Sequence, residues 1–139
     1  MAAQLGFARA QCNLAWCYEY GRGVERNLTR AVHWYRKAAE QGLAGAEHNL
    51  GNAYFKGQGV PQNYVEAVKW YRSAAWLGYP PAQTELGRCM EFGAGTPKDL
   101  EQAVRWYRAA AEQGHAPGQC CLGFLYEIGQ GVEQSWAGA

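Results

Sequence analysis

The sequence lacks any apolar run near the ~20 residues that a helix needs to cross a bilayer. Its first residues show neither the basic start nor the apolar stretch of a signal peptide. It also lacks an excess of one charge, because 13 Lys and Arg face 12 Asp and Glu, for a formal net charge of +1. A chain this close to neutral is a poor match for nucleic acid or an acidic membrane surface. We therefore expect no membrane and no nucleic-acid partner, and the compartment stays unassigned.

Residues that commonly carry catalysis are scarce. Ser73 and Ser135 are the only serines, neither has a lysine three residues on, and Asp99 is the only aspartate. Five cysteines are an odd number, which argues against a complete set of intrachain disulfides, and they form no zinc-site spacing. Gly-x-Gly occurs four times, each time without the third glycine of a dinucleotide-binding fingerprint. These absences predict no enzyme activity, no metal and no cofactor.

What the sequence does have is a repeat of 36 residues. The segment 46–54 recurs at 82–90, and related segments begin at 10 and at 118. Each unit repeats a leucine, two glycines two residues apart, and then, where the unit is complete, a Trp-Tyr pair, an Ala-Ala pair and a closing glycine. The leucine column contains Leu14, Leu50, Leu86 and Leu122. Self-similarity at such a period predicts an array of stacked supersecondary units.

Within one unit the apolar spacing is helical. Residues such as Leu50 and Tyr54 recur at helical spacing up to Gly57, which predicts a first helix. A second helix is expected from the N-cap residue Asn63 to just before Gly78. One hairpin cannot bury its aromatic residues alone, so the units should stack into an all-α solenoid. The side chains expected to be mostly buried are Leu50, Tyr54, Trp70 and Tyr71.

The order of these columns resembles the Sel-one-like repeat (SLR) family, a 36-residue relative of the tetratricopeptide repeat. The pattern is Ala-x-x-x-Leu-Gly-x-x-Tyr-x-x-Gly-x-Gly-Val, followed by Asn or Asp, Ala, Trp-Tyr, Ala-Ala and Gly. Three positions depart from it: Met90 replaces Tyr, Thr96 replaces Val and Gly118 replaces Ala. The resemblance implies a right-handed α/α superhelix of antiparallel helix hairpins. Some secreted cysteine-rich relatives carry cysteine pairs eight residues apart, and the matching positions here hold no cysteine.

The repeat frame assigns residues 1–139 to a single domain. It contains a stub at 1–9, full units at 10–45, 46–81 and 82–117, and a partial unit at 118–139. The stub matches the tail of a second helix, as in segment 38–43. Neither end has the polar face expected of a solenoid cap. We therefore interpret the chain as a natural or engineered piece of a longer array, with apolar ends that favour association.

In this superfamily the first helix of each hairpin usually lines the concave face. Repeat positions three, seven, ten and eleven point away from the core stripe of that helix. Aromatic side chains alternate there with amide and charged groups, which suits a peptide groove. The alternative is that these aromatic residues merely pack between adjacent first helices. The candidate groove residues are Trp16, Tyr20, His48, Asn52, Phe55, Lys56, Arg88, Phe92 and Phe124.

These observations favour a non-enzymatic scaffold that binds a protein or peptide on its concave face. The alternative is a structural or engineered repeat fragment that self-associates through its uncapped ends and has no ligand of its own. In that case the first helix of the partial C-terminal unit would dock on the same helix of another copy across a twofold axis and form a homodimer. The residues expected in this contact are Leu122, Leu125, Tyr126 and Ile128.

One unit breaks the pattern on its outer surface. Trp76 and Leu77 stand where the sister units have Glu-Gln, at 40–41 and 112–113. An apolar pair in a charged column indicates a local contact surface. The alternative is that the Trp76 ring lies over Arg72, four residues back, as a cation–π pair.

Overall fold

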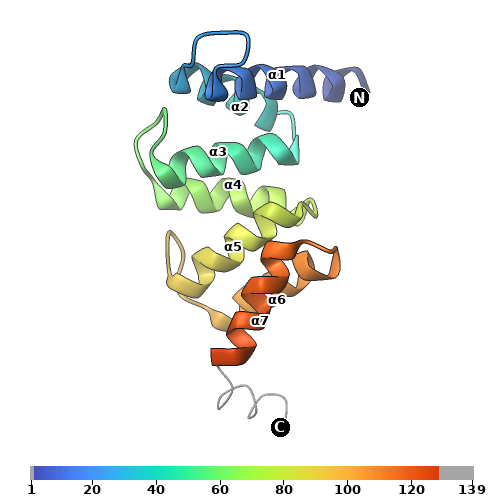
Figure 1. Cartoon of the computed structure of the whole chain (residues 1–139), viewed down its shortest axis with the longest axis vertical. Coiled ribbons are helices and arrows are strands. Elements are labelled where there is room, and N and C mark those ends of the chain that lie inside the picture. Colours follow the sequence, from blue (N-terminus) through green and yellow to red (C-terminus); the bar gives the residue numbers. More distant parts are fainter. Residues whose placement is uncertain (1, 129–139) are drawn as a thin grey trace.

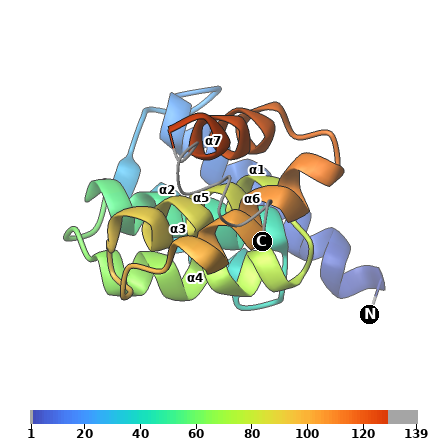
Figure 2. The same ribbon diagram turned by 90° about the horizontal axis from the view of Figure 1, so that it is seen from below.

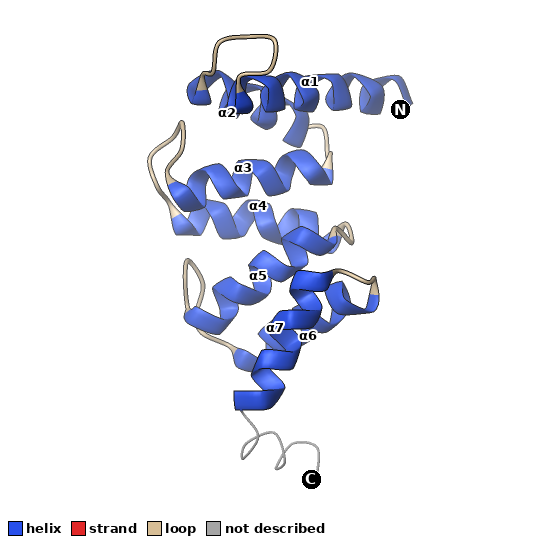
Figure 3. Ribbon diagram, in the orientation of Figure 1, coloured by secondary structure: helices blue, strands red, loops and turns tan. Residues whose placement is uncertain are grey.

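The computed structural model describes residues 2–128, and every regular element in that range is an α-helix. The helices follow one another as three hairpins and a final helix (Figure 1). Short loops join the helices within this range, and no strand occurs there (Figure 3). The bounds are α1 Ala2–Tyr20, α2 Leu28–Ala39, α3 Ala44–Lys56, α4 Tyr64–Trp76, α5 Pro80–Phe92, α6 Leu100–Glu112 and α7 Ala116–Ile128.

Local signals place the helix ends where the repeat predicts them. The side chain of Asn63 accepts a hydrogen bond from the backbone N–H of Glu66 (3.1 Å) and caps α4. Asn27 and Asp99 cap α2 and α6 in the same way. At the end of α3, Gly57 takes a left-handed conformation with φ of 69°, which a side chain would strain. Each hairpin loop thus begins with a glycine and ends with a polar cap.

Glycines bring the two helices of a hairpin into close contact. A Cβ atom on Gly51 would lie 2.8 Å from the ring of Tyr71, and one on Gly87 would lie 2.6 Å from the ring of Tyr107. The tyrosine ring therefore lies directly over the glycine of the facing helix. In the first hairpin this column holds Ala15, which is also buried. The small residue of each first helix admits an aromatic ring between the two helices.

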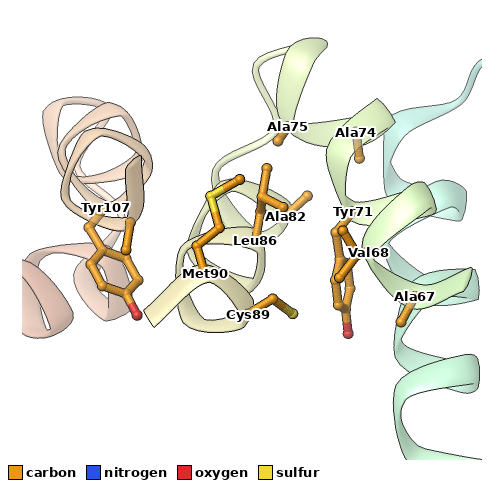
Figure 4. Close-up of a cluster of buried hydrophobic side chains, with 11 residues drawn as sticks. Ala67, Val68, Tyr71, Ala74, Ala75, Ala82, Leu86, Cys89, Met90 and Tyr107 are labelled. Carbon is orange, nitrogen blue, oxygen red and sulfur yellow. The ribbon is translucent and has the colours of Figure 1, made fainter. Parts of the chain in front are cut away.

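The core consists of two clusters of buried side chains. One cluster spans α1, α2 and α3, and the other spans α4, α5 and α6. Figure 4 shows the second cluster, in which Leu86 and Met90 of α5 lie between Tyr71 of α4 and Tyr107 of α6. The two clusters meet in the middle hairpin, where Phe55 of α3 packs against the second cluster and Trp70 of α4 packs against the first.

The predicted burial is confirmed for all four residues. Leu50 and Tyr71 are fully buried. Tyr54 and Trp70 are mostly buried and lie at the rim of the core. The Tyr54 hydroxyl reaches the protein surface, where it accepts a hydrogen bond from the guanidinium of Arg36 on the preceding hairpin.

Each second helix also contacts the first helix of the next hairpin. In this way α2 meets α3, α4 meets α5, and α6 meets α7. The hairpins stack along the long axis of the molecule (Figure 1), and the view along that axis shows them overlapping (Figure 2). The all-α solenoid of helix hairpins predicted from the repeat is confirmed.

The N-terminal segment differs from the prediction. The expected tail of a preceding second helix instead continues into α1, a single helix from Ala2 to Tyr20. Gly6 lies inside this helix, whereas its equivalents Gly42 and Gly78 each take a φ of 87° in the turn between hairpins. That turn forms where one packed helix meets the next. Residues 2–5 are helical as well and extend α1.

Candidate peptide-binding surface

A row of side chains follows the first helices α1, α3, α5 and α7. Two positions of each helix, four residues apart, lie on the same helix face. Stacking by the 36-residue repeat brings this pair to the same side of every unit. The residues of this first-helix row are Trp16, Tyr20, Asn52, Lys56, Arg88, Phe92, Phe124 and Ile128.

Exposed aromatic rings are the main feature of the row. Phe92 is 72% exposed, and Trp16, Tyr20 and Phe124 are also exposed. The rings of Trp16 and Tyr20 lie 5.2 Å apart, and the guanidinium carbon of Arg22 stands 5.3 Å from the Trp16 ring centroid. Packing between adjacent first helices therefore does not account for these four rings, which leaves them available to a partner.

A narrow cleft of about 80 Å³ lies between α1 and α3, and residues of α2 complete its wall. Three candidate groove residues line this cleft, namely Tyr20 of α1 and Asn52 and Lys56 of α3. Sequence reasoning missed Asn49, which also lines it. The available signal was the helical spacing of Asn49 with Asn52 and Lys56, which places all three on one face. Amide and ammonium groups in this position can bind carbonyl or carboxylate oxygens.

In the first and third hairpins, a tyrosine of the second helix holds a glutamate of the first. The Tyr35 hydroxyl donates to Glu19 Oε1 at 2.6 Å, and the Tyr107 hydroxyl donates to Glu91 Oε1 at 2.6 Å. Burial raises the pKa of both tyrosine hydroxyls, and the hydrogen-bonded glutamates raise it further. Both hydroxyls therefore stay protonated and act as donors.

The middle hairpin uses two groove candidates for its own packing. Phe55 occupies the position that holds glutamate in the sister units. The Tyr71 hydroxyl donates instead to Asn52 Oδ1 at 2.6 Å. The Phe55 ring packs on Tyr64, with ring centroids 4.8 Å apart. Phe55 is thus a packing residue, whereas Asn52 keeps its NH₂ group for a ligand.

His48 lies apart from the first-helix row, between two hairpins. Its ring centroid is 5.6 Å from that of Tyr79 and 6.0 Å from that of Tyr71. Burial lowers the pKa of the imidazole to about 4, and the nearby His115 and Lys56 act in the same direction. A neutral imidazole among aromatic rings fills space in the packing between hairpins.

Two cations interrupt the aromatic side chains of the row. Lys56 is exposed at the end of α3. Arg88 of α5 is exposed as well, and its Nη1 lies 3.3 Å from Glu85 Oε2. A surface ion pair between residues three apart is weak and leaves several guanidinium donors open. The row can therefore contact both apolar and acidic parts of a bound segment.

The self-association candidates lie on α7. Leu122 and Leu125 are half-buried against the core cluster of α4–α6, and Tyr126 is half-buried as well. Ile128 is exposed. At the position of Leu122, the equivalent Leu86 of α5 is 0% exposed. The α7 face therefore keeps part of its apolar area uncovered.

Residues 2–128 contain no group of three or more side chains that could hold a metal ion. The cysteines in this range are free, and burial raises the pKa of the Cys89 thiol to about 12, which keeps it protonated. No helix of this part of the chain is long and apolar enough to span a bilayer. The candidate site is thus a surface of aromatic, amide and charged side chains.

The sequence model of the Sel1 repeat matches residues 8–43, 44–79, 80–115 and 116–135. The structure is similar to a protective antigen of uropathogenic Escherichia coli strains that displays an SLR fold. The TM-score is 0.86 at 40% sequence identity, over 92% of this chain and 27% of the antigen. A Sel1 repeat protein from Oxalobacter formigenes gives a TM-score of 0.83 at 44% identity, over 91% of this chain and 51% of that one.

A third similar structure, cysteine rich protein B of Helicobacter pylori, gives a TM-score of 0.71 at 22% identity, over 87% of this chain and 93% of that one. This likeness concerns the fold alone. No curated protein matches the sequence. The chain spans 27% of the Escherichia coli antigen and 51% of the Oxalobacter protein, so it corresponds to only part of each.

Proposed function

Because the chain belongs to the Sel1 repeat family, we propose that it is a non-enzymatic scaffold that binds a peptide segment of a partner protein along the first-helix row. Sel1 repeats commonly mediate protein–protein interaction. The observation that carries the proposal is the series of exposed rings at equivalent positions of α1, α5 and α7. Large apolar side chains left in water on one side of a solenoid are typical of an interaction surface.

The chemistry of the row suits an extended segment with mixed side chains. Trp16 and Phe92 offer wide apolar contacts, which usually dominate binding energy at protein interfaces. The cleft beside Tyr20 adds Asn49 and Lys56, whose donors fit main-chain carbonyls or a carboxylate. A ligand that spans the row would therefore combine aromatic anchors with polar contacts that fix its register.

A peptide-display selection against the purified chain tests this proposal. The enriched peptides are synthesised, and their Kd is measured by fluorescence anisotropy for the native chain and for a double variant, Trp16→Ala with Phe92→Ala. We expect the double variant to bind at least about tenfold more weakly, because truncating an aromatic anchor removes much of an interface's binding energy.

Val65→Ala is a matched control, since Val65 is an exposed apolar residue on α4 outside the row. It should leave the Kd unchanged. Peptides that bind the double variant as tightly as the native chain would place the binding site elsewhere. A selection that enriches no peptide at all would argue against a peptide scaffold.

Self-association through α7 is a second candidate function, favoured by the half-exposure of Leu122 and Leu125. We propose an isologous dimer in which α7 of one copy packs on α7 of another across a twofold axis. Light scattering at about 100 μM should then show a dimer for the native chain. Leu125→Glu should give a monomer, because it places a charge in the contact. A native chain that is monomeric at this concentration contradicts the dimer.

A further inference from the structure

Three departures from the repeat meet in one cleft. Trp76 stands where the sister units have Glu, Met90 where they have Tyr, and Thr96 where they have Val. All three residues line a cleft of about 310 Å³ formed by α4, α5, α6 and the loop before α6. Substitutions that lie apart in the sequence therefore converge on a feature that the repeat alone does not create.

A pair of tryptophan rings forms one wall of this cleft. Trp76 is 75% exposed, and its ring meets that of Trp106 edge to face, at 5.5 Å and 88°. A second cleft of about 260 Å³ adjoins the pair and shares Trp76, Gln102 and Trp106 with the first. The cation–π contact of Trp76 with Arg72 expected from the sequence was wrong. The Trp76 ring packs instead on Trp106, which the next hairpin supplies.

Arg72 lacks the partner that equivalent arginines have. Arg36 donates a hydrogen bond to the hydroxyl of Tyr54 on the next first helix, and Arg108 donates in the same way to the hydroxyl of Tyr126 on α7. Met90 takes the place of that tyrosine for Arg72 and offers no hydroxyl. Within residues 2–128 the Arg72 side chain makes no hydrogen bond or ion pair. Its exposed guanidinium therefore lines the cleft with its donors free.

The charged groups around the tryptophan pair are mostly positive. Arg72 and Lys98 line the first cleft, and Arg105 lines the second. Among the residues that line the two clefts, the single carboxylate is Asp99, and it is engaged, because it accepts hydrogen bonds from the backbone N–H and the side-chain amide of Gln102. The surface is thus complementary to a ligand that joins negative charge to an apolar group.

We propose that the Trp76–Trp106 cleft binds an acidic peptide segment with one aromatic or long aliphatic anchor residue. The anchor contacts the two tryptophan rings, and flanking carboxylates bind the Arg72 guanidinium and the Lys98 ammonium. A nucleic acid fits less well, because three cations and one carboxylate release few counterions. This cleft shares no residue with the first-helix row, so the proposal stands independently of the function proposed above.

A fluorophore-labelled pentapeptide with blocked ends tests the inference. It has a central phenylalanine with two glutamates on each side. We expect its anisotropy to saturate below about 1 mM on titration with the full chain. Raising the NaCl concentration from about 0.05 to 0.5 M should weaken binding, since the carboxylate contacts are screened. The same peptide with lysines in place of the glutamates should not bind.

Two substitutions that restore the repeat should remove the site. Trp76→Glu removes a wall of the cleft and places a carboxylate four residues from Arg72, as Glu40 stands from Arg36. Met90→Tyr returns the hydroxyl that the sister units offer to their arginine. Each should weaken binding of the pentapeptide at least about tenfold.

Lys69→Gln is the control, because Lys69 is an exposed cation of α4 outside the cleft. It should leave the Kd within about twofold. Circular dichroism checks the fold of each variant, and Arg72→Gln provides a third test that leaves the core residues intact. No saturation at 1 mM, equal binding of the lysine peptide, or affinity unchanged in Met90→Tyr and Arg72→Gln overturns the proposal. Preferential binding of a single-stranded oligouridylate through Trp76 also overturns it.

Discussion

Equivalent repeat positions have different neighbours in the middle of the solenoid and around its outermost described helices, α1 and α7. Leu86 of α5 is 0% exposed, whereas Leu122 at the same position of α7 is half-buried. A Cβ atom on Gly95 would lie 2.3 Å from the carbonyl oxygen of Tyr64 on the preceding hairpin. A Cβ atom on the equivalent Gly23 would meet nothing within 4 Å.

This difference separates two roles of a repeated residue. Some residues serve the hairpin that contains them, while others serve the contact with a neighbouring hairpin. The second glycine of the hairpin loop belongs to the latter group, because it lets the loop lie against the first turn of the preceding second helix. Paired substitutions at one column, in the middle and near an end of the described chain, test this distinction.

The largest effect is expected in the leucine column. Leu86→Ala should lower the free energy of unfolding by about 2–5 kcal/mol, since it leaves a cavity in a closed core. Leu122→Ala should cost roughly half as much, because the side chain already contacts water. Urea unfolding followed by circular dichroism measures both. Equal losses would show that α7 is packed as tightly as α5.

The loop glycines should show the next largest difference. Gly95→Ala introduces a clash with a backbone oxygen and also strains a φ of +73°, so we expect a loss of about 3 kcal/mol. Gly23→Ala strains a similar φ of +77° in open space, and it should cost only about 1 kcal/mol. Thermal unfolding of the two variants compares them directly, and a larger loss for Gly23→Ala would reverse the interpretation.

Alanine substitution at the repeat position of Gly51 and Gly123 should change stability in opposite directions in the middle hairpin and in α7. Gly51→Ala should destabilise by about 1–2 kcal/mol, because its Cβ would lie 2.8 Å from Tyr71. The effect stays moderate, since Ala15 shows that a hairpin of this kind can accommodate the methyl group. Gly123→Ala meets nothing within 4 Å and should stabilise α7 by about 0.5–1 kcal/mol. Destabilisation by both changes in urea unfolding would contradict this prediction.

The smallest effect concerns a buried carboxylate of the middle unit. Glu47 is 4% exposed where the sister units have Gln11 and Gln83. Burial raises its pKa, although a hydrogen bond from Ser73 partly opposes the shift. The contribution of Glu47 to the free energy of unfolding is therefore fully present below the unfolded-state pKa of its carboxyl group. This contribution is lost as the pH rises through the folded-state pKa.

Glu47→Gln should accordingly stabilise the chain at pH 7 and have little effect near pH ~4. Urea unfolding at both pH values measures the difference. Gln83→Glu is the reciprocal variant and should destabilise at pH 7. A stabilising effect of Glu47→Gln that is the same at both pH values would show that ionisation is not its cause.

Much of the fold could be predicted because its signals are local and repeated. The caps Asn27, Asn63 and Asp99 and the turn at Gly57 each depend on residues within a few positions. The N-terminal stub was mispredicted, because α1 runs through Gly6, whereas the same repeat position forms a turn at Gly42 and Gly78. Local pattern alone does not report whether a neighbour is present.

The candidate site was less predictable, because its side chains contact residues of other helices and other hairpins. Phe55 stands where the sister units have Glu, and the Tyr71 hydroxyl donates to Asn52 instead, so Phe55 becomes a packing residue and Asn52 has one acceptor engaged. Likewise the partner of Trp76 is Trp106 on another helix, not Arg72 on its own. These contacts depend on the distances between helices, which cannot be calculated from the repeat period.

The middle hairpin joins the two buried clusters, and this has a consequence for local opening. Amide hydrogen exchange reports cooperative units, and these follow buried contacts more closely than sequence repeats. Because Trp70 of α4 packs against the first cluster and Phe55 of α3 packs against the second, the slowest amides of α3 and α4 should exchange together and belong to the most protected group. A flanking helix can then open without the middle hairpin, whereas opening of the middle hairpin exposes both clusters.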